Sequence, residues 1–101
     1  MSTIDLASLT ADRFESLRGQ AFELSAPGGA LALTLAEVRR LGEALRPGGA
    51  FSLLFVAKDA HHLPQAIYPL NHPELGQVDI FLVPIGPVPG GGGFGYEAVF
   101  T

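Results

Sequence analysis

The segment from residue 63 to 86 constrains the fold of this chain most strongly, because it encodes two apolar strands joined by a tight turn. The turn spans residues 71–76. Within it, Pro73 fixes its own φ angle and favours an extended His72, while Gly76 can adopt the left-handed φ at which such a turn ends. The turn therefore sets the register of the two strands and determines which side chains face the core.

Alternating apolar residues predict several further strands, separated by turns rich in proline and glycine, at 22–25, 31–35, 51–56 and 96–100. The segment 34–45 is ambiguous. Thr34 and Glu37 have the spacing of a helical capping box and apolar residues recur at near-helical intervals, but Gly42 interrupts the pattern. Of helix and strand, we favour a long strand that continues to about Leu41 and is followed by a loop.

The N-terminal region predicts one short helix. Thr10 is a suitable N-cap, residues 11–18 form the body, and Gly19 can end it in the left-handed conformation. Leu9 and Phe14 have the spacing of a hydrophobic staple. A helix this short must pack on a larger body. We therefore expect a mainly β fold, either a small antiparallel sandwich or a partly closed barrel of about six strands, with one short N-terminal helix.

Length and composition predict one domain with an unusual surface. The 101 residues suffice for one core, and no repeat, charge block or low-complexity arm marks a boundary, so we expect a single β-rich domain over residues 1–101. Charged residues make up 16% of the chain, against roughly 25% in a typical soluble domain. A partner or further copies of the chain would cover the apolar surface that this implies. Alternatively, glycine and proline occupy positions where charges usually lie.

Charge and cysteine content exclude several classes of function. A net charge of −4 with six lysines and arginines argues against a nucleic-acid partner and against a basic membrane-surface helix. The absence of cysteine excludes disulfides, thiolate catalysis and cysteine-based zinc sites. The first residues do not read as a secretory signal, and no apolar run is long enough to span a bilayer. We expect a protein with no membrane partner that is cytoplasmic, or exported without a cleaved signal peptide.

The motifs that could bind a cofactor or a metal are weak. Residues 90–95 match Gly-x-Gly-x-x-Gly, but that loop binds dinucleotides only where it opens a helix, and here an alternating strand follows it. We expect a loop between the last two strands and no cofactor. His61 and His62 point to opposite sides of an extended chain, and His72 and Glu74 flank a proline. The histidines are expected at exposed or turn positions, and no metal site is expected.

Catalytic residues are not indicated either, because no serine lies in a nucleophile elbow and no spacing implies a triad. We therefore expect no enzyme. Phe94 lies between two glycines, and is either an exposed aromatic side chain that anchors an interface or a core residue. Phe94, His72 and Glu74 are the residues that we expect to take part in an interaction.

The central hairpin resembles a family of short bacterial proteins catalogued as a domain of unknown function (6916). The resemblance covers roughly residues 14–101, and its most specific part is His72-Pro73-x-Leu75-Gly76 followed by Phe81-Leu82-Val83-Pro84, with Leu63-Pro64-Gln65 upstream. The resemblance implies no catalytic residue for this chain. What it implies is a role in an assembly of the kind that contains tail-collar or tail-fibre-like proteins.

The leading expectation is a non-enzymatic structural or interaction protein that self-associates or belongs to a larger, phage-tail-like assembly, with itself or another protein as its partner. A second hypothesis is a small-ligand-binding β-barrel with a pocket between the sheets, at whose mouth the loop 90–95 lies. A packed interior would argue against this alternative. A third is a small enzyme that uses His72 and Glu74.

Overall fold

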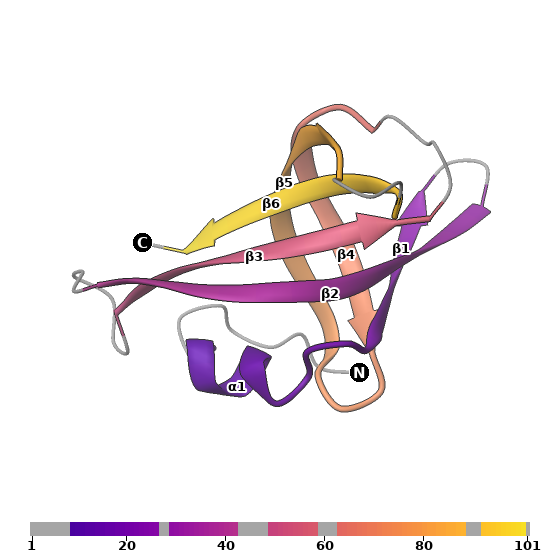
Figure 1. Ribbon diagram of the computed structural model, residues 1–101. Coiled ribbons are helices and arrows are strands. Elements are labelled where there is room, and N and C mark those ends of the chain that lie inside the picture. The colour runs from indigo at the N-terminus through magenta and orange to yellow at the C-terminus, as the bar shows by residue number, and fades with distance from the viewer. Residues whose placement is uncertain (1–8, 27–28, 43–48, 59–62, 89–91, 101) are drawn as a thin grey trace.

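The computed structural model describes residues 9–26, 29–42, 49–58, 63–88 and 92–100 (Figure 1). Within them, a single helix precedes six strands: α1 (Ala11–Glu15), β1 (Ala21–Ala26), β2 (Gly29–Gly42), β3 (Ala50–Ala57), β4 (Ala66–His72), β5 (Gly76–Pro87) and β6 (Phe94–Phe100). All strand pairings are antiparallel, and the sheet closes on itself in the order β1-β2-β3-β6-β5-β4. The predicted mainly β fold is confirmed, as one closed strand ring rather than a two-sheet sandwich.

The two ends of the sheet meet in a short seam between β1 and β4. The paired residues there are Glu23 with Asn71 and Leu24 with Leu70, whereas the neighbouring β4–β5 ladder has seven pairs. The next residue along this edge of β4 is Pro69, which has no N–H to donate, so the ladder does not continue. From this seam β1 and β4 diverge (Figure 1).

β2 continues to Gly42, which confirms the predicted long strand in the ambiguous segment. Its register against β3 shifts twice, between Leu35 and Glu37 and between Arg40 and Gly42. Each shift is a bulge that breaks the period-two alternation, and this irregularity is what gave the segment a helix-like spacing. The loop predicted after this strand falls on residues 43–48, outside the described residues.

The helix α1 is capped as predicted but is shorter than predicted. The Thr10 side chain accepts a hydrogen bond from the Arg13 N–H, at 3.3 Å. The helix ends at Glu15 and not at Arg18, because the next backbone bonds tighten to a three-residue span, from Leu17 to Phe14 and from Arg18 to Glu15. Gly19 follows with a φ of +88°, in the left-handed conformation that was expected.

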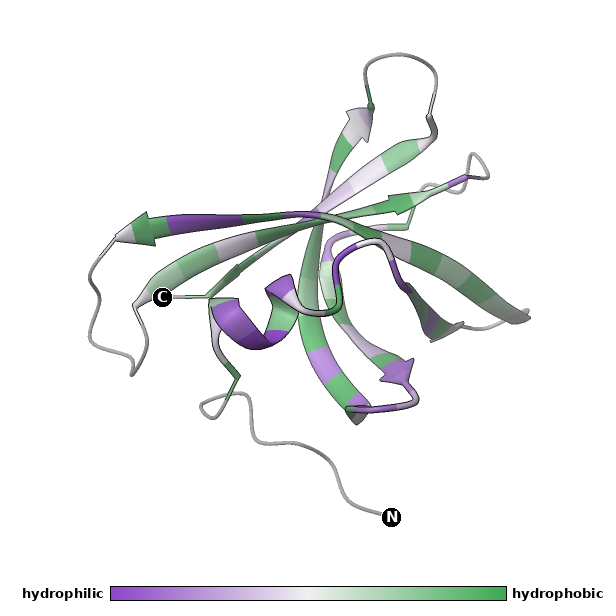
Figure 2. Cartoon of the chain, turned by 60° about the horizontal axis from the view of Figure 1, so that its bottom comes forward, coloured by the Kyte–Doolittle hydropathy of each residue, from purple (hydrophilic) through white to green (hydrophobic). Residues whose placement is uncertain are grey.

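Apolar side chains from α1 and all six strands fill the ring. The helix lies across one end of it, as Figure 2 shows from that side. The Phe14 ring lies 5.8 Å from that of Phe51 and 5.7 Å from that of Phe100, and the latter two rings stack at 4.7 Å. Leu9, the other staple residue, is buried in the same core. This aromatic cluster closes one end of the ring.

Replacing Phe14 with alanine should therefore lower the free energy of unfolding by about 3–5 kcal/mol, because it removes both ring contacts and leaves a cavity. Arg13→Ala is the matched control, since the Arg13 side chain is exposed and the capping N–H is retained. Urea unfolding measures both variants. Equal effects of the two substitutions would contradict the role given to Phe14.

Candidate functional site

The outer surface of β4, β5 and β6 carries most of the large exposed apolar side chains of the described residues. Ile67 and Phe81 form a direct cross-strand pair, and the two residues are 67% and 47% exposed. Ile85 and Val99 are exposed to a similar degree. We call these four residues the outer apolar face. Patches of this kind on a small protein commonly mark contact sites.

Strand alternation explains why these side chains face outward. In β5, Val78, Ile80 and Leu82 are buried in the ring, so Phe81 between them must point to the outside. Val83 pairs with Glu97 of β6. The ladder ends at this pair, and Phe81 and Val99 lie two residues beyond it, each on the outward side of its own strand.

The charges of the chain are strongly segregated. Residues 59–101 contain four acids and no lysine or arginine, whereas residues 1–58 contain six of each sign. The whole net charge of −4 therefore belongs to the part of the chain that includes β4, β5 and β6. Within the described residues, Glu74, Asp79 and Glu97 form no ion pair.

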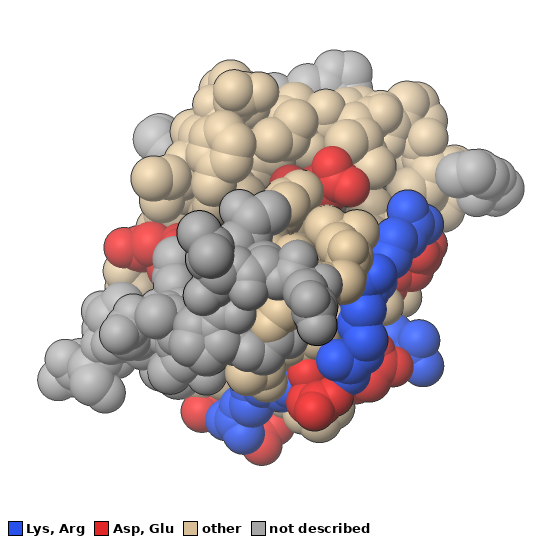
Figure 3. Space-filling view, turned by 90° about the vertical axis from the view of Figure 1, so that its left-hand side faces the viewer, with Lys and Arg blue, Asp and Glu red and all other residues tan. Residues whose placement is uncertain are grey.

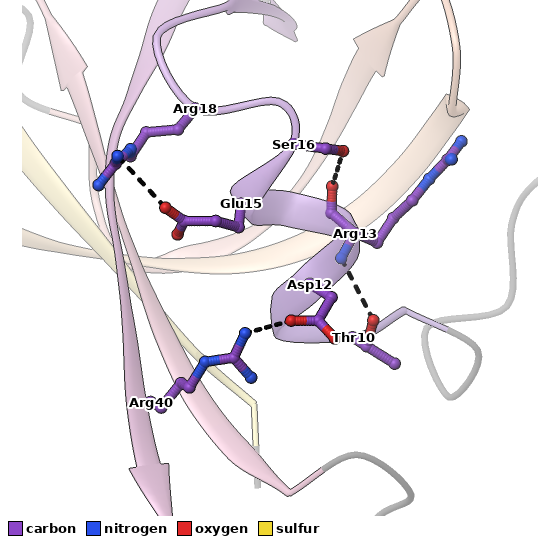
Figure 4. Close-up of polar contacts among 7 residues, drawn as sticks. All are labelled: Thr10, Asp12, Arg13, Glu15, Ser16, Arg18 and Arg40. Carbon is purple, nitrogen blue, oxygen red and sulfur yellow. Dashed lines mark hydrogen bonds and ion pairs between the residues drawn. The ribbon is translucent and has the colours of Figure 1, made fainter.

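The arginines lie mainly over α1 and β2, and most are neutralised within the chain. Figure 3 shows blue and red side chains gathered over the lower part of the molecule, where α1 and β2 lie, and a mostly uncharged upper part. The ion pairs are Arg18 with Glu15, Arg39 with Glu37, and Arg40 with Asp12, two of which appear in Figure 4. The acids near the outer apolar face have no such partner among the described residues.

His72 was expected at an exposed or a turn position, and the structure places it at the start of the turn but not exposed. Its side chain is buried, with its ring 4.8 Å from that of Phe22. Nδ1 accepts a hydrogen bond from the backbone N–H of Glu74 at 3.0 Å, so Nε2 is the protonated nitrogen of the neutral ring and donates to Oε1 of Gln20 at 2.7 Å. Nδ1 thus fixes the turn, and Nε2 joins the turn to Gln20, which precedes β1.

The predicted interaction residues do not converge. Phe94 is half-buried and packs against the core, with its ring 5.3 Å from that of Tyr96, so the structure favours the core interpretation. Glu74 is exposed and contacts His72 through its backbone N–H. The turn that holds both lies at the bottom of Figure 1, while β6 begins at the upper right. His61 and His62 lie outside the described residues.

The glycine-rich loop leads into a strand, as predicted, since β6 begins at Phe94. The Val88 N–H donates to the Gly93 carbonyl at 2.9 Å and so closes its described part. Residues 90 and 91 of the motif are outside the described residues. Within them, no cluster of three or more histidines, aspartates and glutamates is arranged to hold a metal.

A small hollow of about 120 Å³ is lined by Glu37, Arg39, Ile85 and Glu97, among others. Two larger hollows open on the outside of the strand ring rather than into its interior. One, of about 550 Å³, lies at the seam between β1 and β4 and is lined by Ala21, Glu23, Ala30, Ala32, Asn71 and His72, among others. The other, of about 540 Å³, lies over β2 and β3 and includes Thr34, Leu54 and Val56. The large side chains of the interior are fully buried.

Sequence reasoning missed the outer apolar face. The run 78–83 is apolar at most positions, which is typical of a strand covered on both sides. In a closed ring one side of each strand faces outward, and nothing among the described residues covers Phe81 completely. The available signal was the absence of lysine and arginine after residue 58.

The described helix is too short to cross a membrane.

We expect His72→Phe to lower the free energy of unfolding by about 1–3 kcal/mol, because it retains the ring on Phe22 but leaves the Glu74 N–H without its acceptor. Glu74→Ala keeps that N–H and should change stability by less than about 0.5 kcal/mol. Thermal and urea unfolding of both variants provide the measurement. An unaffected His72→Phe protein would argue against the structural role of this histidine.

Gly93→Ala should destabilise the protein by at least about 2 kcal/mol, because left-handed strain and a steric clash add. Gly93 has a φ of +127°, and a Cβ there would lie 2.2 Å from the Ala57 carbonyl oxygen. Gly92→Ala is the control, since its Cβ would meet only the Val88 side chain, at 3.4 Å. Comparable unfolding midpoints for the two variants would refute this explanation.

Comparison with known proteins identifies the family to which this chain belongs. The model of the family described as Domain of unknown function (DUF6916) matches residues 9–100. No curated protein and no solved structure matches the chain. The match covers all six strands and the helix, and the chain belongs to this family.

Proposed function

We propose that this protein is a non-enzymatic interaction protein that works within a larger protein assembly and docks through its outer apolar face. The observation that carries the proposal is the cross-strand pair of Ile67 and Phe81, both largely exposed on the outside of the strand ring. Covering one large apolar side chain contributes roughly 1.5–3 kcal/mol. Four such side chains provide the apolar centre that a protein interface needs.

The acids around this face define the chemistry of the partner. Asp79 lies two residues before Phe81, and Glu97 two residues before Val99, so each acid shares the outward side of its strand with an apolar residue. No cation of residues 59–101 offsets them. A partner surface that combines apolar side chains with lysine or arginine therefore matches this face.

The alternative functions have weaker support. A ligand-binding barrel needs an interior cavity, whereas the described hollows open outward and the interior side chains are fully buried. A small enzyme based on His72 needs a ring nitrogen that can exchange a proton with a substrate, and both nitrogens already have partners within the fold. Neither alternative accounts for Ile67 and Phe81.

A photo-crosslinking residue in place of Phe81 tests the proposal in the producing cell. With p-benzoylphenylalanine at this position, we expect a discrete adduct on irradiation, whose mass identifies the partner as another protein or as a second copy. The adduct should decrease at least tenfold when Ile67→Glu is added, since a buried charge disrupts an apolar contact. Ser16 is the control position, because it is exposed and caps the C-terminal end of α1, which covers one end of the ring rather than its outer side.

Two results would count against the proposal. One is the absence of any discrete adduct at position 81. The other is a set of adducts that is the same at positions 81 and 16 and is unaffected by Ile67→Glu.

A further inference from the structure

β2 has an unpaired edge along its second half. β1 pairs with one edge of β2 as far as Thr34. On the same edge, the N–H and C=O of Leu35 form backbone hydrogen bonds with Gln20 and Gly19. Beyond Leu35, β2 pairs with β3 on one side, and no described residue pairs with its other side. An unpaired strand edge is a template for another strand.

The residues of β2 that direct their backbone N–H and C=O groups to this edge can be identified. Leu35 is buried in the ring, and its N–H and C=O point to this edge, where they bond Gln20 and Gly19. After the bulge, Val38 is the next residue that packs on the core. Residues on one side of a strand direct their backbone groups to the same edge, so Val38 presents its N–H and C=O to the unpaired edge.

We propose that a second copy of this chain pairs with this edge, with β2 antiparallel to β2 and a twofold axis at Val38. In this register the two Val38 residues exchange a pair of backbone hydrogen bonds. Glu37 then lies opposite Arg39 of the second copy in a pair without hydrogen bonds, where facing side chains approach most closely. The twofold axis repeats this contact, so opposite charges meet twice.

Charge complementarity identifies a second copy as the occupant. The sequence Glu37-Val38-Arg39 is its own complement in antiparallel alignment, whereas a parallel alignment would oppose equal charges. Both side chains are available, with 57% and 69% exposure, and within the chain they share a single contact of 3.6 Å. Charged residues on an edge usually prevent pairing, and this pattern prevents pairing with most strands except its own copy.

This contact is separate from the Ile67–Phe81 pair of the outer apolar face. In the ring order β5 is three strands away from β2 in either direction, whereas Ile85 and Glu97 line a hollow of about 120 Å³ together with Glu37 and Arg39. Pairing at β2 therefore leaves Ile67 and Phe81 uncovered. The inference thus goes beyond the proposed function and stands on its own observation.

Charge reversal tests the proposed register by sedimentation velocity and light scattering. The wild-type protein should reach twice the 10.6 kDa mass of one chain. Glu37→Arg alone and Arg39→Glu alone should each raise the dissociation constant at least tenfold, because like charges then face each other twice. An equimolar mixture of the two variants, and the double variant E37R/R39E, should both recover the dimer.

Controls separate this interface from others and from misfolding. Asp79→Lys reverses an exposed charge on β5, three strands away from β2 in the ring order, and should leave the dimer unchanged, and circular dichroism should show that every variant is folded. Phe81→Ser should also retain the dimer. A monomeric wild-type protein would overturn the proposal, as would a dimer that survives both single reversals or is lost in Phe81→Ser, or a mixture that fails to associate.

Discussion

The structure depends on a short helix that closes one end of the strand ring. Phe51 and Phe100 lie at the ends of β3 and β6, facing inward, and without a cover they would expose two stacked aromatic rings. Phe14 packs on both. A five-residue helix cannot be stable alone, so the helix and the ring end stabilise each other. The ion pair between Asp12 and Arg40 then joins α1 to β2 on the surface (Figure 4).

Closure of the sheet decides how the surface is divided. Each strand of a ring has one inward side, so the apolar residues left over on β4, β5 and β6 must face solvent or a partner. The same closure pairs many strand edges. Among the described residues, the seam at Leu24 and Leu70 is short, β5 before Val83 and β6 after Glu97 do not pair with each other, and the second half of β2 is unpaired on one edge. The low charge content of the chain is therefore concentrated in one part of the structure. Lysine and arginine are absent from residues 59–101, which include β4, β5 and β6.

Local patterns were sufficient to predict the strands, and distant contacts explain the errors. The turn at Pro73 and the alternation in 51–56 and 96–100 specified strands that the structure contains, because turn chemistry and period two are local properties. The burial of His72 depends on Gln20, which is 52 residues away in the chain and comes near only when β4 meets β1. The outward position of Phe81 likewise follows from closure, which no local pattern specifies.

A closed ring can associate through a remaining backbone edge or through apolar side chains on its outside, and these two contacts differ in what they select. The proposed backbone pairing at β2 would select by direction and by the facing charges of Glu37 and Arg39, and a twofold axis would limit it to two chains. Side-chain contact at Phe81 selects by shape and by the acids beside it. Because Phe81 lies three strands away from β2 in the ring order, a pair of chains joined at β2 in the proposed register would leave Ile67 and Phe81 of both copies uncovered. Taken together, the two proposals describe a protein that would link two copies of another component, as a small part of a repeating assembly does.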